Sequence, residues 1–177
     1  MKLKGIVFDL DNTLVQSHVD FPKMKRRIIE LLEGNGHPPD TLSPIDQTTV
    51  VIMEHAESEW ERQGKPEEER RRLRDVITGY MNQGELEAVE TLTEIPGVSE
   101  AVEKLKAKGI KLAILTRGHH EYAVEALKKT GIHDYFDLIL GRGETPQPKP
   151  YREAIDYTVR RMGLTVDEVV MVGDHQI

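Results

Sequence analysis

The sequence contains no cysteine among its 177 residues. Disulfide bonds, cysteine-held metals and a thiol nucleophile are therefore excluded, and we expect a cytoplasmic protein. Apolar runs are also only a few residues long, so we expect no membrane-spanning segment. The first residues, Met1 to Gly5, lead straight into an apolar strand, and we expect no secretory signal.

Acidic residues outnumber basic residues, 31 to 24, and the formal net charge is −7. This balance argues against a general nucleic-acid binder, so we expect no nucleic-acid partner. Hydrophobic residues make up 38% of the chain and charged residues 31%, which is typical of a water-exposed globular protein. The length suits one domain, or a core domain with a smaller insertion.

The most informative stretch is an apolar run that ends in Asp9, Asp11 and Thr13. Side chains alternate along a strand, so Asp9 and Asp11 project to the same side if strand geometry persists. Two carboxylates this close at the end of a buried strand repel each other unless a cation or a shared proton compensates. Mg²⁺ would do so, because it prefers oxygen ligands.

The remaining pattern predicts an α/β fold, with a Rossmann-like parallel sheet built from βαβ units. The near-continuous apolar character of the first strand, about residues 4–10, indicates burial on both faces. We expect strands over residues 110–115, 137–140 and 169–172, alternating with helices over residues 98–108, 119–130 and 151–162.

Between the first strand and this series, residues 17–93 predict only helices. Asp20, Ser43 and Pro66 each suit a helix start, and Gly84 should separate a short last helix. We therefore expect a discontinuous core, residues 1–16 and 94–177, with a helical cap over 17–93. The cap arginines, Arg26, Arg27 and the cluster from Arg70 to Arg74, fit a solvated face or contact with an anionic substrate; the first alternative is favoured.

Polar residues at the strand ends should meet, because ligands of parallel α/β sheets bind beyond the carboxyl ends of the strands. Besides the first strand, these ends carry Thr116, Arg117 and Gly118, then Lys149, then Asp174. Carboxylates, a hydroxyl and an ammonium group at one edge suit Mg²⁺-assisted phosphoryl transfer to or from a small phosphorylated metabolite.

These motifs together resemble the haloacid dehalogenase superfamily, in particular its phosphatases with a helical cap. Asp9-Leu10-Asp11-Asn12-Thr13 resembles the first family motif, Asp-x-Asp-x-Thr, and Thr116 the second. Lys149-Pro150 resembles the third motif and Gly173-Asp174 the fourth. The four motifs in order, each at a strand end, are far more specific than any one of them.

The resemblance implies roles for these residues. Asp9 would be the nucleophile that forms an aspartyl-phosphate, and Asp11 the general acid and base. Phosphoryl oxygens would be bound by Thr116, Arg117, Gly118 and Lys149, with backbone N–H groups near Leu10 to Asn12. Mg²⁺ would be held by Asp9, the main-chain carbonyl of Asp11, and Asp174.

The sequence departs from the family pattern after Asp174, where only three residues remain. The family usually has a second acidic residue about four positions later, then a further strand and helix. We therefore expect either a fragment or a core lacking its C-terminal part.

The expected function is Mg²⁺-dependent hydrolysis of a small phosphomonoester by a phosphoglycolate phosphatase-like enzyme. A phosphomutase of the β-phosphoglucomutase kind, or a non-catalytic phosphate-binding or regulatory protein on the same fold, are the alternatives. The sequence leaves the substrate and the oligomeric state open.

Overall fold

The computed structural model describes residues 3–174, which form two compact units. One unit combines the residues up to 18 with those from 85 onward, and the other comprises residues 19–84. The expected cap boundaries, 17 and 93, lie outside the second unit, and the assignment of core and cap stays a prediction.

The first unit is built on a parallel four-stranded sheet in the order β5-β4-β1-β6, so the predicted α/β class is confirmed. The strands are β1 (Gly5–Phe8), β4 (Lys111–Leu115), β5 (Leu138–Leu140) and β6 (Val169–Val172). Every residue of β1 is buried, as are four of the five in β4, which matches their uninterrupted apolar character. Phe8 lies opposite both Ile114 and Val172, so the ends of β1 and β6 are level and β4 extends one residue further.

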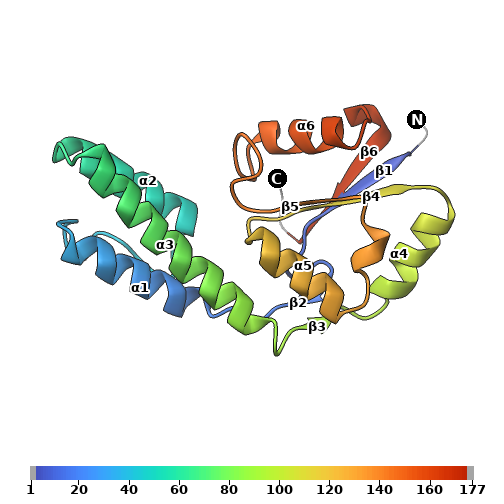
Figure 1. The fold of residues 1–177 in the computed structure, drawn as a ribbon, viewed down its shortest axis with the longest axis horizontal. Coiled ribbons are helices and arrows are strands. Elements are labelled where there is room, and N and C mark those ends of the chain that lie inside the picture. The colour runs from blue at the N-terminus through green and yellow to red at the C-terminus, as the bar shows by residue number, and fades with distance from the viewer. Residues whose placement is uncertain (1–2, 175–177) are drawn as a thin grey trace. The chain divides into compact units, whose positions relative to one another are not determined.

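Three helices cover this sheet: α4 (Val98–Ala107), α5 (His120–Lys129) and α6 (Arg152–Arg161). Figure 1 shows α6 on one side of the sheet and α4 and α5 on the other. Two short 3₁₀ helices, η1 (His133–Tyr135) and η2 (Val166–Glu168), lie in the connections before β5 and β6.

A second, antiparallel pair of strands was not expected from the sequence. It joins β2 (Val15–Gln16) to β3 (Thr93–Glu94). Two-residue strands are too short to give a periodic pattern, so only the fold brings them together. This pair ties the segment after β1 to the segment before α4.

The second unit contains α1 (Phe21–Gly34), α2 (Thr49–Arg62) and most of α3 (Glu67–Ala88), up to Gly84. Their shared core includes Ile28, Leu32, Ile52, Trp60 and Ile77, all buried. Side chains at three- and four-residue spacing on each helix supply this core, as the sequence pattern predicts.

Two of the expected helix boundaries in this region are wrong. The second helix begins at Thr49, capped by Thr48, because the Ser43 hydroxyl instead closes a local turn by accepting from the N–H groups of Ile45 and Asp46. The last predicted helix is not separate, because α3 continues through Gly84. Glycine lowers helix stability by only about 1 kcal/mol, and buried Met81 and Glu85 on either side give the helix tertiary contacts.

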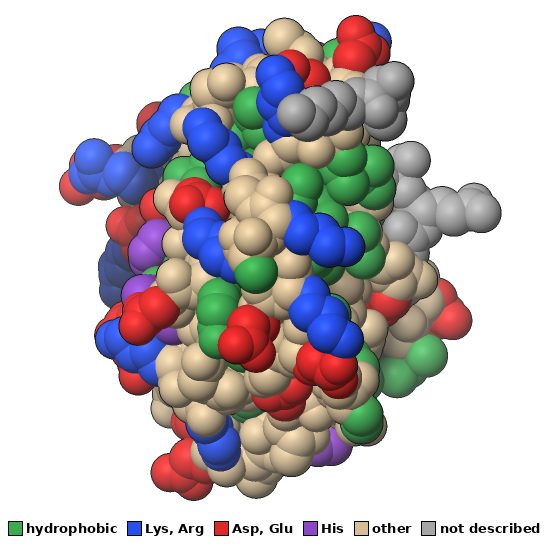
Figure 2. Space-filling model, turned by 90° about the vertical axis from the view of Figure 1, so that its right-hand side faces the viewer, with side chains coloured by type: hydrophobic (Ala, Val, Ile, Leu, Met, Phe, Trp, Pro, Cys, Tyr) green, Lys and Arg blue, Asp and Glu red, His purple; other side chains and the backbone are tan. Residues whose placement is uncertain are grey.

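The surface drawn in Figure 2 has basic and acidic side chains interspersed with apolar ones. Among residues 3–174, no helix is both long and apolar enough to cross a membrane.

Candidate active site

The turn after β1 fixes the main chain of the two candidate carboxylates. The Leu10 carbonyl accepts hydrogen bonds from the N–H groups of Thr13, Leu14 and Val15, so the chain folds back and β1 ends earlier than predicted. Asn12 adopts a left-handed conformation with φ of 57°, which asparagine tolerates better than most residues. The Asp9 N–H donates to the Val172 carbonyl at 2.8 Å and so ties the turn to β6.

Asp9 and Lys149, predicted from separate motifs, form an ion pair. Lys149 Nζ lies 2.7 Å from Asp9 Oδ1, and the lysine side chain is only 6% exposed. The same oxygen also accepts from the Leu10 N–H at 2.8 Å. Among residues 3–174, no group donates to the other carboxylate oxygen, Oδ2. Burial lowers the pKa of Lys149, while the facing Asp9 carboxylate opposes that shift. The pair places a cation beside one oxygen of a carboxylate and leaves the other oxygen available.

Asp11 lies in a different environment from Asp9. Burial raises the pKa of the Asp11 carboxyl, and the charges of Asp9 and Glu85 act in the same direction. Hydrogen bonds from Tyr122 and Ser17 oppose this shift without cancelling it. The two carboxyl groups of this turn therefore differ in environment: Asp9 forms a salt bridge, whereas burial raises the pKa of Asp11.

Tyr122, which sequence reasoning missed, contacts Asp11 directly. Its hydroxyl donates to Asp11 Oδ1 at 2.5 Å, and the residue is completely buried on α5. Its position in the inward stripe of that helix predicts a core residue. A buried hydroxyl calls for a polar partner, but the sequence does not reveal that the partner lies 111 residues away.

Thr116, Arg117 and Gly118 follow β4 as predicted. The Thr116 side chain is buried, and its hydroxyl oxygen accepts from the Gly118 N–H at 3.0 Å. Within residues 3–174, the N–H groups of Leu10, Asn12 and Gly118 therefore all donate inside the protein. The Arg117 side chain is exposed, and its positive charge contributes to lowering the pKa of Lys149.

A largely buried ion pair supports this loop. The two terminal guanidinium nitrogens of Arg142 donate to Glu85, at 2.8 and 3.0 Å, and Glu85 also accepts from the His119 N–H at 2.8 Å. Arg142 contacts the Arg117 carbonyl as well. Neither Glu85 nor Arg142 belongs to the predicted motifs, because nothing in the sequence pairs two charges so far apart.

Gly141 allows two loops to approach each other closely. A Cβ atom at this position would lie 2.6 Å from His120 N and 2.9 Å from the Gly118 carbonyl oxygen. Both are main-chain atoms, so no side-chain rotation would relieve the overlap. The loop after β5 therefore packs directly on the segment from Gly118 to His120.

The predicted magnesium ligands are all oxygen atoms. Asp174 follows β6, which pairs with β1 up to Phe8, so it ends up at the same edge of the sheet as Asp9. Residues 3–174 contain no group of three or more His, Asp or Glu side chains that could hold a metal ion. The predicted set needs only two carboxylates, with the Asp11 carbonyl as the third atom, and an oxygen set of this kind suits Mg²⁺.

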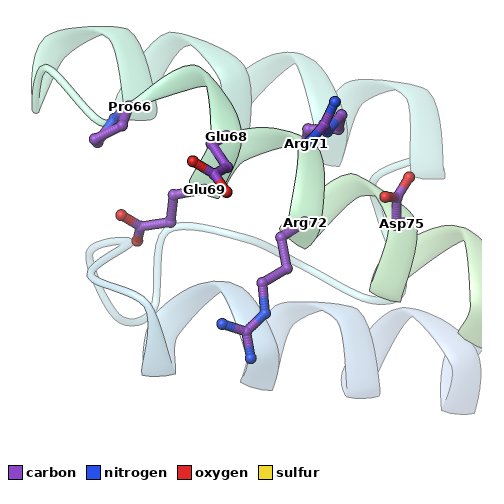
Figure 3. Close-up of a pocket in the computed structure, with 6 residues that line it drawn as sticks. All are labelled: Pro66, Glu68, Glu69, Arg71, Arg72 and Asp75. Atoms are coloured by element: carbon purple, nitrogen blue, oxygen red, sulfur yellow. The ribbon is translucent and has the colours of Figure 1, made fainter.

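A shallow hollow of about 460 Å³ lies elsewhere, at the start of α3 in the second unit. Figure 3 shows its six lining residues along the first turns of the helix, with acidic and basic side chains mixed. The lining is Pro66, Glu68, Glu69, Arg71, Arg72 and Asp75. Because it contains no residue of the four motifs, the hollow is not the candidate active site.

Comparison with known proteins agrees with the family resemblance. A sequence model of haloacid dehalogenase-like hydrolases matches residues 3–176. The chain is 28% identical to the glyceraldehyde 3-phosphate phosphatase of Methanocaldococcus jannaschii, over 97% of this chain and 76% of that protein. It is 27% identical to phosphoglycolate phosphatase 1 of Pseudomonas aeruginosa, over 96% of this chain but only 61% of the relative.

The fold agrees as well. The crystal structure of a predicted phosphoglycolate phosphatase from Haemophilus somnus 129PT matches with a TM-score of 0.61 and 26% identity. That match covers 98% of this chain and 78% of the other. With a family match over nearly all of its length, the chain belongs to the haloacid dehalogenase-like hydrolases.

Proposed function

We propose that this protein is a Mg²⁺-dependent phosphatase that hydrolyses a small phosphomonoester through an aspartyl-phosphate. The observation that most supports this proposal is the contrast between the two carboxyl groups after β1. Asp9 is salt-bridged to a buried lysine, whereas burial raises the pKa of Asp11. A nucleophile must be ionised and a general acid must hold a proton, so this contrast supports the division of roles.

In the proposed reaction, Asp9 Oδ2 attacks phosphorus, and the bond from phosphorus to the leaving oxygen breaks. Asp11 gives its proton to that oxygen, and an alcohol leaves. A water molecule then attacks the phosphorus of the aspartyl-phosphate while Asp11 takes up its proton. The bond to Asp9 breaks, inorganic phosphate is released, and Asp11 is again protonated.

The other strand-end residues would bind the phosphoryl group. Lys149 supplies a buried cation beside the attacking carboxylate, and Thr116 supplies a hydroxyl at the end of β4. Arg117 and Gly118, in the loop after β4, would also bind the phosphoryl group. Asp9, the Asp11 carbonyl and Asp174 would hold Mg²⁺, which would offset negative charge on the phosphoryl oxygens.

The test is Mg²⁺-dependent phosphate release from a panel of phosphomonoesters that includes phosphoglycolate and glyceraldehyde 3-phosphate. We expect turnover by the wild type and none by Asp9→Asn, which keeps the shape but removes the nucleophile. Thermal unfolding of Asp9→Asn checks that the loss is not one of folding. A folded wild type that binds phosphate and turns over no substrate would contradict the proposal and favour the regulatory alternative.

The mutase alternative makes a different prediction with the same panel. It requires turnover that depends on a sugar bisphosphate activator, with the phosphoryl group moved and not released. The small-metabolite substrate class is supported by what the relatives are named for, whereas the cytoplasmic location and the lack of a nucleic-acid partner stay predictions.

A further inference from the structure

Tyr122 connects two parts of the proposed site that come from different strands. Its hydroxyl donates to Asp11 Oδ1 at 2.5 Å. Its ring packs on the loop after β4, because a Cβ atom added to Gly118 would lie 3.0 Å from Tyr122 Cδ1 and 3.4 Å from Thr116 Oγ1. The residue is fully buried, so neither contact is shared with bulk solvent. The Tyr122 side chain therefore contacts both Asp11, the proposed acid, and the loop after β4.

The Tyr122 hydroxyl is the donor in this contact. A tyrosine hydroxyl ordinarily ionises only at about pH 10, so it keeps its proton at neutral pH. A hydroxyl that keeps its proton and points at Oδ1 makes that oxygen an acceptor. When Asp11 is protonated, its proton is then placed on Oδ2.

The contact restrains the Asp11 side chain. A fully buried hydroxyl on α5 fixes one oxygen of the carboxyl group, so this carboxyl group has few rotamers open to it. Orientation of an acid within hydrogen-bond reach of the leaving oxygen is what general acid catalysis requires.

We infer that Tyr122 is a positioning residue: by occupying Asp11 Oδ1, it holds the acid with its proton on Oδ2, facing the leaving oxygen. The inference rests on the proposed phosphatase function. Tyr122 does not touch the reacting atoms and exchanges no proton with substrate. It acts only through Asp11, so its contribution should scale with how much the leaving group needs an acid.

Leaving-group dependence therefore tests the inference. An alkyl phosphate expels a poor leaving group and needs the proton of Asp11, whereas 4-nitrophenyl phosphate expels a stable anion and does not. In Tyr122→Phe, which keeps the ring and loses only the hydroxyl, kcat/KM for the best alkyl phosphate of the panel should fall about 10- to 100-fold. For 4-nitrophenyl phosphate, kcat/KM should change less than about threefold.

Tyr157→Phe is the matched control, because among residues 3–174 its hydroxyl accepts only from Arg161, on the same helix, at 2.9 Å. This variant should keep the wild-type ratio of the two kcat/KM values. An equal loss on both substrates in Tyr122→Phe, or no loss on either, would overturn the inference while the phosphatase proposal stands. A folded wild type inactive on both substrates would overturn the phosphatase proposal and the inference with it.

Discussion

Glu85 and Arg142 face each other in a two-pronged ion pair across 57 residues of sequence. The Glu85 side chain is 5% exposed and that of Arg142 25%. Glu85 also accepts the N–H of His119, at the start of α5. The pair therefore links the last turn of α3, the loop after β4 and the loop after β5.

Removing the Glu85 charge should be costly, because Arg142 is only partly exposed and loses two charge-assisted hydrogen bonds. We expect Glu85→Gln to lower the free energy of unfolding by about 2–3 kcal/mol, below the full cost of a buried pair because Arg142 is partly exposed. Urea denaturation measures this. In a double-mutant cycle with Arg142→Gln, the double variant should lose less than the sum of the single variants.

An exposed pair gives the matched comparison. Lys128 and Glu125 lie 2.8 Å apart on the surface of α5, and Lys128→Gln should leave the urea midpoint nearly unchanged. If both substitutions shift the midpoint equally, burial is not what makes the Glu85 pair important.

Gly141 should not tolerate even a methyl group. Gly141→Ala places Cβ against main-chain atoms of His120 and Gly118, so we expect destabilisation of about 1–3 kcal/mol by overpacking. Gly79→Ala is the opposite case, because Gly79 lies within α3 with open space around it. That substitution should stabilise by about 0.5–1 kcal/mol through helix propensity. Thermal unfolding of the two variants should therefore move in opposite directions.

The Lys149 ammonium should set the affinity for phosphate. Lys149→Gln removes a buried positive charge from the proposed phosphoryl site, and the competitive inhibition constant of inorganic phosphate should rise about 10- to 100-fold. Lys111→Gln is a control on charge alone, because Lys111 Nζ binds the Met162 carbonyl at 2.7 Å on another part of the unit. An equal rise in both variants would mean that overall charge, and not the site, attracts phosphate.

Asp137 predicts a pH dependence of stability. Burial tends to raise the pKa of its carboxyl, but hydrogen bonds from Lys106 and the Leu112 N–H outweigh it and leave the pKa below its ordinary value of 3.8. A lowered pKa in the folded state contributes stability that is present above 3.8 and lost as the pH falls through the folded value. The stability advantage of wild type over Asp137→Asn should therefore shrink in acid. A difference that stays constant down to strongly acidic pH would contradict this account.

The Asp11 carboxyl should have the opposite effect on the pH dependence of stability. Its pKa is raised, mainly by burial, so ionisation costs folding free energy as the pH rises above the ordinary value of 3.8. Asp11→Asn should therefore unfold at a higher temperature than wild type at neutral pH, in buffer with a metal chelator, while turnover of alkyl phosphates is lost. A variant that is both inactive and less stable would show that the carboxylate supports the fold.

Sequence reasoning reached those features that depend on a local pattern. Apolar runs located β1, β4 and β6, and the polar residues at their ends included both members of the Asp9–Lys149 pair. The family expectation is confirmed by the match over residues 3–176.

What sequence reasoning missed depends on contacts between distant segments. Tyr122 looks like an ordinary core residue, and its role is apparent only once α5 is packed near the turn after β1. The sequence predicts that Glu85 begins a separate short helix, because Gly84 indicates a helix stop that tertiary packing overrides. The same applies to the two-residue strands β2 and β3, which have no pattern of their own.

The hydrogen bond from the Asp9 N–H to the Val172 carbonyl has a consequence for measurement. Among the described strands, β6 lies at the end of the sheet order and pairs only with β1. The amide proton of the residue proposed to attack phosphorus is therefore protected from solvent only while β6 stays docked. Hydrogen exchange at that single amide would report how often β6 separates from β1. Separation of β6 and displacement of the main chain of the proposed nucleophile would then be one event, reported by one probe.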